Sequence, residues 1–306
     1  MQDSIFSIKI GQILPNYKAG IFSVNSEQPV QDAFKLMIEK KVLSLPLYDN
    51  TFRRFNKFID MVDIVCFCMR NFQKKELVDL DLDYILESKE IFEKYKCGDI
   101  CDLSGRNAWC PVESTAPLSV AIDLMVKWNV HRIPVIDSEG NLVSILTQSR
   151  ILEYLHSFID RLEGTSKTLE QMQIASNSIV SIRLDSLAID AFKLIQEHSV
   201  SAIAVVNKIG ILCGNISVSD MKMIGYDGKL LSRMFLPVES FMEFIPKNDS
   251  VKMFNSGVVA VTQESTLEEI IEKFHLSKVH RLYKVDKEGK PVQVVSQGDV
   301  LKYFTH

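Results

Sequence analysis

One pattern occurs four times along the chain, and this internal repeat is the strongest constraint on its fold. Each copy begins with a short stretch of β-forming residues, passes through a polar turn into an amphipathic helix, and ends in a second apolar strand. In the first copy, Val30, Ala33 and Phe34 fall on one face of the predicted helix. The copies cover residues 21–49, 108–137, 178–207 and 257–286.

Two spacings support this alignment. From an inward-facing helix residue to the turn after the second strand there are 16 positions in every copy: Ala33 to Asp49, Ala121 to Asp137, Ala191 to Asn207, and Ile270 to Asp286. From that turn to a position near the start of the next helix there are 14, 13, 13 and 13, ending at Asp63, Arg150, Asp220 and Asp299. Chance alternation of strands and helices would not hold both spacings over four copies.

A third strand and a second helix follow each copy, which predicts an α/β (α+β) fold of four β-α-β-β-α units. One unit alone leaves a sheet face uncovered, so we expect the units to pair. The first module is predicted at 1–164, with repeats at about 8–72 and 96–160, and the second at 165–306, with repeats at about 168–228 and 232–306. Residues from about 72 to 98 are predicted to form a polar helical connector.

Composition narrows the classes of function. The chain is 46% hydrophobic and 24% charged, which is ordinary for a globular protein. A formal net charge of −4 argues against nucleic-acid binding. No stretch approaches the roughly 18 apolar residues of a membrane helix, and the N-terminus lacks a signal-peptide pattern. We therefore expect a cytoplasmic and/or nuclear protein without a membrane partner. The six cysteines form no Cys-x-x-Cys pair, so we expect no metal site.

A hydroxyl or carboxylate residue recurs at the start of the second helix of each unit. The pairs are Ser217 with Asp220, Ser296 with Asp299, Thr147 with Arg150, and Asp60 with Asp63. A helix N-terminus is suited to bind anions, and a carboxylate there can accept hydrogen bonds from both hydroxyls of a ribose. Ser and Asp are also common helix caps, so the motif alone leaves capping and ligand binding equally open.

A His-Arg pair precedes the second strand in the even-numbered repeats, as His131-Arg132 and His280-Arg281. Both arginines can bind phosphate through two parallel hydrogen bonds. One such pair would usually be a surface arginine beside a half-buried histidine. Two equivalent pairs in two modules favour a shared phosphate site.

These residues resemble the cystathionine-β-synthase (CBS) domain family, and in particular the gamma subunit of AMP-activated protein kinase. The segment NVHRIPVIDSEGNLVSILTQSRILEYL (129–155) is similar to the gamma subunit's second repeat, VSAIAVVN (200–207) with ISVSDMKMI (216–224) to its third, and SKVHRLYKVD (277–286) with VSQGDVLKY (295–303) to its fourth. The resemblance covers nearly the whole chain, and the order Asp, Arg, Asp, Asp across the repeats is its more specific feature.

The resemblance implies a disk of two modules, called Bateman modules, with sites for AMP, ADP or ATP near its centre. It implies a non-catalytic, nucleotide-sensing subunit that regulates a protein kinase with alpha and beta partner subunits. The implied ribose ligands are Asp63, Asp220 and Asp299. The implied phosphate ligands are Thr147, Arg150, His131, Arg132, Ser217, His280, Arg281 and Ser296. Val200, Ser201 and Ala202 are expected near the adenine.

The chain departs from the gamma-subunit pattern at two positions of the first repeat and at one of the second. Leu43 stands where that family has a phosphate-binding Arg, Asp60 where it has Thr, and Ser149 where it has Lys. Each change removes positive charge or adds negative charge. We therefore expect repeats three and four to dominate nucleotide binding, and Asp63 and Arg150 to mark weaker sites.

Three other interpretations stay open. The chain also resembles, more loosely, fungal four-CBS proteins that restrain protein phosphatases. A scaffold with empty nucleotide clefts is a further alternative. An enzyme is disfavoured, because the sequence has no Gly-rich phosphate loop, no Gly-x-Ser-x-Gly elbow and no His-Glu-x-x-His.

Overall fold

The computed structural model describes residues 5–14, 20–71, 90–176, 179–226, 230–245 and 258–305, and within them it forms four three-stranded sheets. In each of the four sheets the first strand lies parallel to the second, and the second lies antiparallel to the third. The four predicted repeats are thereby confirmed.

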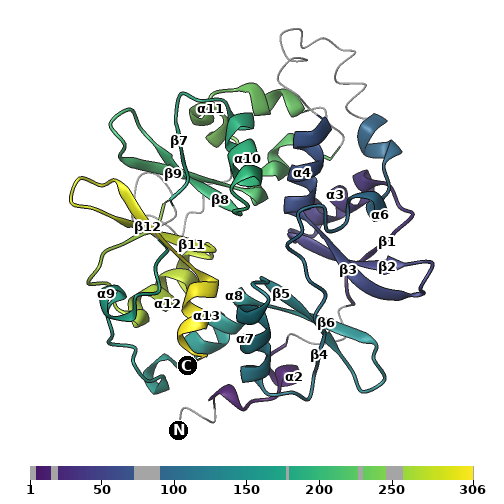
Figure 1. The fold of residues 1–306 in the computed structure, drawn as a ribbon, viewed down its shortest axis with the longest axis horizontal. Helices are drawn as coiled ribbons and strands as arrows, with labels where there is room; N and C mark the ends of the chain where they lie inside the picture. The colour runs from purple at the N-terminus through teal and green to yellow at the C-terminus, as the bar shows by residue number, and fades with distance from the viewer. Residues whose placement is uncertain are drawn as a thin grey trace.

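Each repeat contains a strand, a helix, two strands and a second helix, in that order (Figure 1). Repeat 1 comprises β1 (Val24–Asn25), α3 (Val30–Glu39), β2 (Ser44–Asp49), β3 (Arg54–Asp60) and α4 (Met61–Asn71). Repeat 2 comprises β4 (Val112–Glu113), α7 (Leu118–Lys127), β5 (Arg132–Ile136), β6 (Leu142–Thr147) and α8 (Gln148–His156).

The second half of the chain repeats this order. Repeat 3 comprises β7 (Ser181–Arg183), α10 (Ala188–Glu197), β8 (Ala202–Val206), β9 (Leu212–Ser217) and the 3-10 helix η4 (Val218–Ile224). Repeat 4 comprises β10 (Ala260–Val261), α12 (Leu267–Ser277), β11 (Arg281–Val285), β12 (Pro291–Ser296) and α13 (Gln297–Tyr303). Before repeat 1 lies α2 (Ile10–Ile13), and between successive repeats lie α6 (Cys97–Ile100), η3 (Ile159–Arg161), α9 (Leu169–Met172), η5 (Leu231–Phe235) and α11 (Val238–Met242).

The chain leaves the first helix of every repeat through one residue in the left-handed backbone conformation. These residues are Lys41, Asn129, Ser199 and Lys278, with φ between 49° and 55°. A non-glycine residue in this conformation costs roughly 1–2 kcal/mol, so the surrounding packing must impose it. The resulting sharp turn fixes the direction in which the second strand starts. In repeats 2 and 4 the His-Arg pairs lie at this start.

The two repeats of a module exchange their entry segments. The N–H of Ile10 in α2 donates to Ala116 O of repeat 2 (3.0 Å), and the N–H of Cys97 in α6 donates to Gln28 O of repeat 1 (2.7 Å). In the second module α9 contacts repeat 4 and α11 contacts repeat 3 in the same way. Residues 8–14, predicted as the start of repeat 1, therefore pack on repeat 2, and the predicted repeat boundaries stay predictions.

The predicted polar connector at 72–98 is only partly described, because residues 72–89 lie outside the described residues. The connector is not polar throughout. Phe92 is fully buried, with its ring centroid 5.9 Å from that of Phe34 and 5.5 Å from that of Phe67. The apolar core of repeat 1 therefore extends into this segment. The module boundary at 164/165 stays a prediction.

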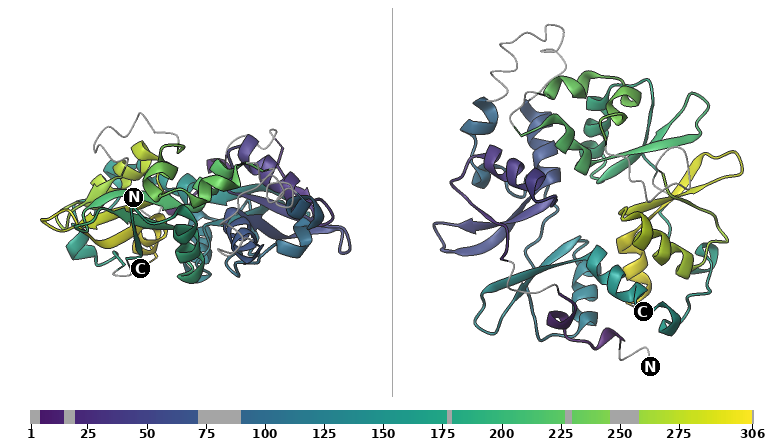
Figure 2. Two further views of the ribbon diagram at one scale, coloured as in Figure 1. Left: turned by 90° about the horizontal axis from the view of Figure 1, so that it is seen from above. Right: turned by 180° about the vertical axis from the view of Figure 1, so that it is seen from behind.

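Two large apolar cores hold the disk together, and each spans both modules. One contains α4 of repeat 1 with α10 and η4 of repeat 3, and the other contains α7 and α8 of repeat 2 with α12 and α13 of repeat 4. Within each module the two repeats also touch. The ring centroids of Phe58 in β3 and Trp109, just before β4, are 4.9 Å apart, and the Tyr283 hydroxyl of β11 donates to Asn215 Oδ1 of β9 (2.7 Å). The four repeats thus surround a common centre in a molecule that is flat when seen edge-on (Figure 2).

We predict that Ile10→Ala lowers the free energy of unfolding by about 2–5 kcal/mol, because Ile10 is fully buried and its loss leaves a cavity where α2 packs on repeat 2. Urea denaturation measures this change. Lys127→Ala, at an exposed position of repeat 2, should stay within about 0.5 kcal/mol of the parent. Equal stability of the Ile10 variant and the parent would contradict the exchanged segment.

Candidate functional site

Strand register brings the two sequence motifs of each repeat together. Arg132 pairs with Thr147 across β5 and β6, and Arg281 pairs with Ser296 across β11 and β12. The equivalent pairs in the odd repeats are Ser44 with Asp60 and Ala202 with Ser217. The residue before each second strand also accepts a hydrogen bond from the first residue of the following helix, as His131 O does from Gln148 N (3.1 Å). Each repeat therefore has one strand-end site, which contains both motifs.

The carboxylates of Asp220 and Asp299 cap their own helices. Ser217 N–H and its hydroxyl donate to Asp220 Oδ2 at 2.7 and 3.0 Å, and Ser296 makes the same bonds to Asp299 Oδ2 at 2.7 and 2.6 Å. This confirms the capping interpretation of the motif. Because Ser217 and Ser296 use only the Oδ2 atoms, their bonds leave the Oδ1 atoms for another donor. Capping and ligand binding are therefore compatible at these two positions.

Burial sets the charge state of Asp220. Desolvation raises the pKa of its carboxyl to about 6, although the bonds from Ser217 and Ser219 oppose the shift. The side chain is 9% exposed. The ionised carboxylate of Asp220 therefore lies in a buried environment that destabilises its negative charge. Such destabilised charges are typical of functional sites.

Asp63 is bound differently from the other two. Its Oδ2 accepts the Asp60 N–H (2.9 Å) and the Asn107 side chain (3.3 Å), and its Oδ1 accepts the Ser104 N–H (2.9 Å). Asp63 is fully buried, and burial together with neighbouring Asp60 raises its pKa well above the usual value. Residues 104–107 thus cover the predicted ribose ligand of repeat 1, and both of its oxygens already accept hydrogen bonds within the protein.

Asp60 has a structural role that its charge alone did not suggest. Its Oδ1 caps α4 by accepting the Val62 and Asp63 N–H groups at 2.8 and 3.0 Å. Its Oδ2 lies 4.0 Å from Arg132 Nη1. Asp60 is therefore the anionic partner of a buried guanidinium, in addition to being a negative charge near a predicted phosphate position.

The His-Arg pairs of repeats 2 and 4 belong to one basic cluster, formed by His131, Arg132, His280, Arg281 and Arg106, in which both histidines are exposed and the three arginines are half-buried. Desolvation and the charges of Arg132, Arg106 and Arg281 lower the pKa of His131. Desolvation and the charges of Arg281 and Arg132 lower the pKa of His280 in the same way. The lowered pKa favours the neutral form of both imidazoles at physiological pH. β5 and β11, which carry these pairs, both begin on the side of the disk centre (Figure 1).

The two arginines of the His-Arg pairs are held in different ways. Arg281 donates to Ala202 O (2.7 Å) and to Ser201 Oγ (2.6 Å) of the paired repeat. Arg132 has Asp60 at 4.0 Å, but its buried Nη1 has no hydrogen-bond partner among the described residues. Leu43 stands where repeat 3 has Ser201, six positions before the turn residue, and it offers no side-chain acceptor.

Arg150 points to another part of the molecule. Its Nε donates to Ile13 O (2.7 Å) and its Nη1 to Glu153 (2.7 Å), so the guanidinium fastens α2 to α8. Thr147 Oγ1 accepts the Arg150 N–H as a helix cap (3.2 Å). The structure therefore does not bring Arg150 into the basic cluster, and its predicted contact with phosphate stays a prediction.

The three residues predicted near the adenine lie where repeat 3 enters β8. Val200 packs against the first core, Ala202 is buried, and the Ser201 hydroxyl is engaged by Arg281. Arg106 was missed by the sequence analysis. It lies in the segment before β4, outside the repeated pattern, so the alignment of repeats carries no signal for it.

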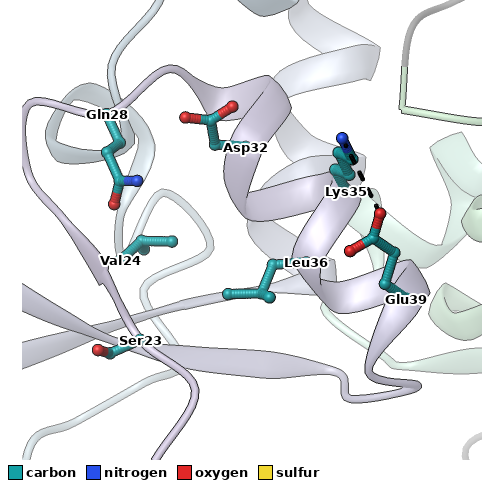
Figure 3. Close-up of a pocket in the computed structure, with 7 residues that line it drawn as sticks. All are labelled: Ser23, Val24, Gln28, Asp32, Lys35, Leu36 and Glu39. Atoms are coloured by element: carbon teal, nitrogen blue, oxygen red, sulfur yellow. Dashed lines mark ion pairs between the residues drawn. The ribbon is translucent and has the colours of Figure 1, made fainter.

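Two shallow cavities lie away from this centre. One of about 190 Å³ is lined by Ser23, Val24, Gln28, Asp32, Lys35, Leu36 and Glu39 of repeat 1 (Figure 3). The other, of about 430 Å³, occupies the equivalent place in repeat 3. None of the predicted site residues lines them. In the described ranges no cluster of three or more metal-ligating side chains occurs, and no helix there is long and apolar enough to span a membrane.

We predict that Asp220→Asn stabilises the protein at pH 7.5 by up to about 3 kcal/mol. The folded state holds the Asp220 proton more tightly than the unfolded state. The parent therefore loses stability as pH rises from about 4 to about 6, and the amide variant lacks this loss. Urea denaturation at pH 4.5 and 7.5 measures it, with exposed Asp123→Asn as control. A stability difference that does not grow between the two pH values would contradict the assignment.

Comparison with known proteins identifies relatives along most of the chain. It is 25% identical to the 5'-AMP-activated protein kinase subunit gamma of Kluyveromyces lactis, over 90% of this chain and 82% of that protein. It is 26% identical to Protein SDS23 of Debaryomyces hansenii, over 88% of this chain but about half (54%) of that longer protein.

A solved structure has the same fold. A protein of Methanocaldococcus jannaschii, described as a candidate archaeal homologue of the kinase gamma subunit, matches 97% of this chain and 100% of its own, with a TM-score of 0.75 at 18% identity. The CBS domain model matches residues 111–157, 172–224 and 251–306. Those matches cover half of the sequence, and the sheet of repeat 1 has the same topology. The chain therefore belongs to the CBS domain family.

Proposed function

We propose that this protein is a non-catalytic regulatory subunit that binds AMP, ADP or ATP at the centre of its disk and thereby regulates a protein kinase complex. The observation that carries the proposal is the basic cluster, in which Arg106 Nη1 and Arg132 Nη1 are buried and have no hydrogen-bond partner among the described residues. Its guanidinium groups are Arg106, Arg132 and Arg281, and Asp60 is the only carboxylate within 4.0 Å of them among the described residues. A buried cation without a partner is costly, so the cluster favours an anionic ligand.

The chemistry beside the cluster suits a nucleotide rather than a simple anion. Asp220 and Asp299 stand at the helix starts of repeats 3 and 4, each with an oxygen that its capping serine does not use. Such oxygens can accept bonds from ribose hydroxyls, while the arginines bind phosphate oxygens. The neutral imidazoles of His131 and His280 can donate to phosphate without adding charge.

The partners are proposed from the relatives. Similarity to gamma subunits of 5'-AMP-activated protein kinase favours kinase alpha and beta subunits. A protein phosphatase is the alternative partner, and a scaffold with empty clefts is the alternative without a ligand. Affinity purification from cells with mass spectrometry distinguishes the first two, because the recovered catalytic subunit would be a kinase or a phosphatase.

We predict that AMP, ADP or ATP binds without hydrolysis, and that Asp220→Ala and Asp299→Ala each weaken binding at their own site by about tenfold to a hundredfold. This is the value of a hydrogen bond to a charged group, about 1.5–3 kcal/mol. Isothermal titration gives the affinities, and a coupled assay for ADP release tests hydrolysis. Exposed Asp123→Ala is the matched control. Steady turnover of ATP, or two folded Asp variants with parental affinity, would refute the proposal.

We further predict an order among the sites, with nucleotide held at Asp220 and Asp299 and weakly or not at all at Asp63. The reason is the cover of residues 104–107, which must move before Asp63 can accept a ribose. A crystal soaked with AMP shows the occupied sites. Nucleotide density at Asp63, with none at Asp220 or Asp299, would reverse this order.

A further inference from the structure

Arg106 occupies a position that the repeats do not account for. It lies between Ser104 and Asn107, the two residues that bind Asp63, in the segment that crosses the start of α4. Its Nη2 lies 3.5 Å from His131 Nε2. Its Nη1 is buried and has no hydrogen-bond partner in the described part of the chain.

A second guanidinium in the same place is also unsatisfied. Arg132 Nη1 is buried without a hydrogen-bond partner, and its one ion pair, to Asp60, has the long distance of 4.0 Å. Arg106 Nη2 lies 3.5 Å from His131 Nε2 and Arg132 is the next residue in the chain, so the three side chains share one region, and both arginines lower the pKa of His131. Two adjacent guanidinium groups repel each other, and an anion between them would remove both the repulsion and the missing hydrogen bonds.

The second module does not share this arrangement. There Arg281 is satisfied by Ser201 and Ala202 of the paired repeat. In the first module the equivalent residues are Leu43 and Ser44, and Leu43 has no polar side-chain atom. The guanidinium nitrogens that lack a hydrogen-bond partner in this cluster, among the described residues, are therefore those of Arg106 and Arg132.

We propose that Arg106 is a phosphate ligand, which together with Arg132 binds a phosphoryl group at the centre of the disk. This inference rests on the proposed function for the identity of the whole ligand, but its chemistry is that of a phosphate or polyphosphate. The residue enters from the segment between repeats 1 and 2 and supplies a cation to a repeat that has Leu43 at its strand-end site. The same segment covers Asp63, so the bound phosphoryl group belongs to a ligand whose ribose, if it has one, is held by another repeat.

The test uses inorganic pyrophosphate and ATP as probes on the full chain, by isothermal titration at constant ionic strength. Arg106→Ala should weaken pyrophosphate binding by about tenfold to a hundredfold, the value of a hydrogen bond to a charged group. Arg106→Lys should restore part of the affinity, since an ammonium keeps the charge but loses the fork of donors. Arg161→Ala, at an exposed position of the same module, should bind as the parent does.

A thermal melt without ligand separates a binding role from a structural one. Removal of an unsatisfied buried cation should leave the melting temperature unchanged or raise it, whereas a large fall would make Arg106 a structural residue and overturn the inference. Parental pyrophosphate and ATP affinities in Arg106→Ala would overturn it while leaving the proposed function intact. Pyrophosphate binding that depends on Arg106, in a protein that binds no adenine nucleotide, would support the inference and refute the proposed function. No pyrophosphate binding by the parent would overturn the inference as well.

Discussion

The accumulation of positive charge where β5 and β11 begin is the constraint on which the rest of the centre depends. Three half-buried guanidinium groups and two imidazoles share one region, and the nearby arginines lower the pKa of both imidazoles and favour their neutral form. Such an arrangement does not stabilise a fold by itself. The two apolar cores, each joining helices from both modules, must hold the facing repeats against this repulsion.

The helix caps show how one residue can serve the fold and a site. Asp299 receives both bonds from Ser296 on a single oxygen, which starts α13 and leaves the other oxygen outside that interaction. Asp63 receives bonds on both oxygens and is closed by Ser104 and Asn107. The difference at Asp63 has two sources: the segment of Ser104 and Asn107 that lies over it, and Asp60, which has no hydroxyl to donate where repeats 3 and 4 have a serine.

Sequence reasoning reached the repeats and the strand-end motifs because both are local and periodic. The spacing from Ala121 to Asp137 recurs in every repeat and follows directly from helix and strand geometry. Sequence reasoning failed where contacts between residues far apart in the sequence determine the position of a segment. The exchange of α2 onto repeat 2 depends on backbone bonds to Ala116, and the attachment of Arg150 to Ile13 follows from that exchange. Arg106 has no periodic partner, and only the folded chain places it beside His131.

The arginine of the His-Arg pair has different partners in the two modules, and the sites at the centre of the disk therefore differ between them. In the second module a neutral serine hydroxyl and a backbone carbonyl satisfy Arg281 without cancelling its charge. In the first, Asp60 offsets the charge of Arg132 at 4.0 Å but leaves Nη1 without a hydrogen bond. An incoming phosphate therefore meets a satisfied cation on one side and, on the other, an unsatisfied cation with a carboxylate behind it. The approach of phosphate to Arg132 is opposed by Asp60 and favoured by Arg106, so the presence of Arg106 decides whether the first module can share a phosphate at all.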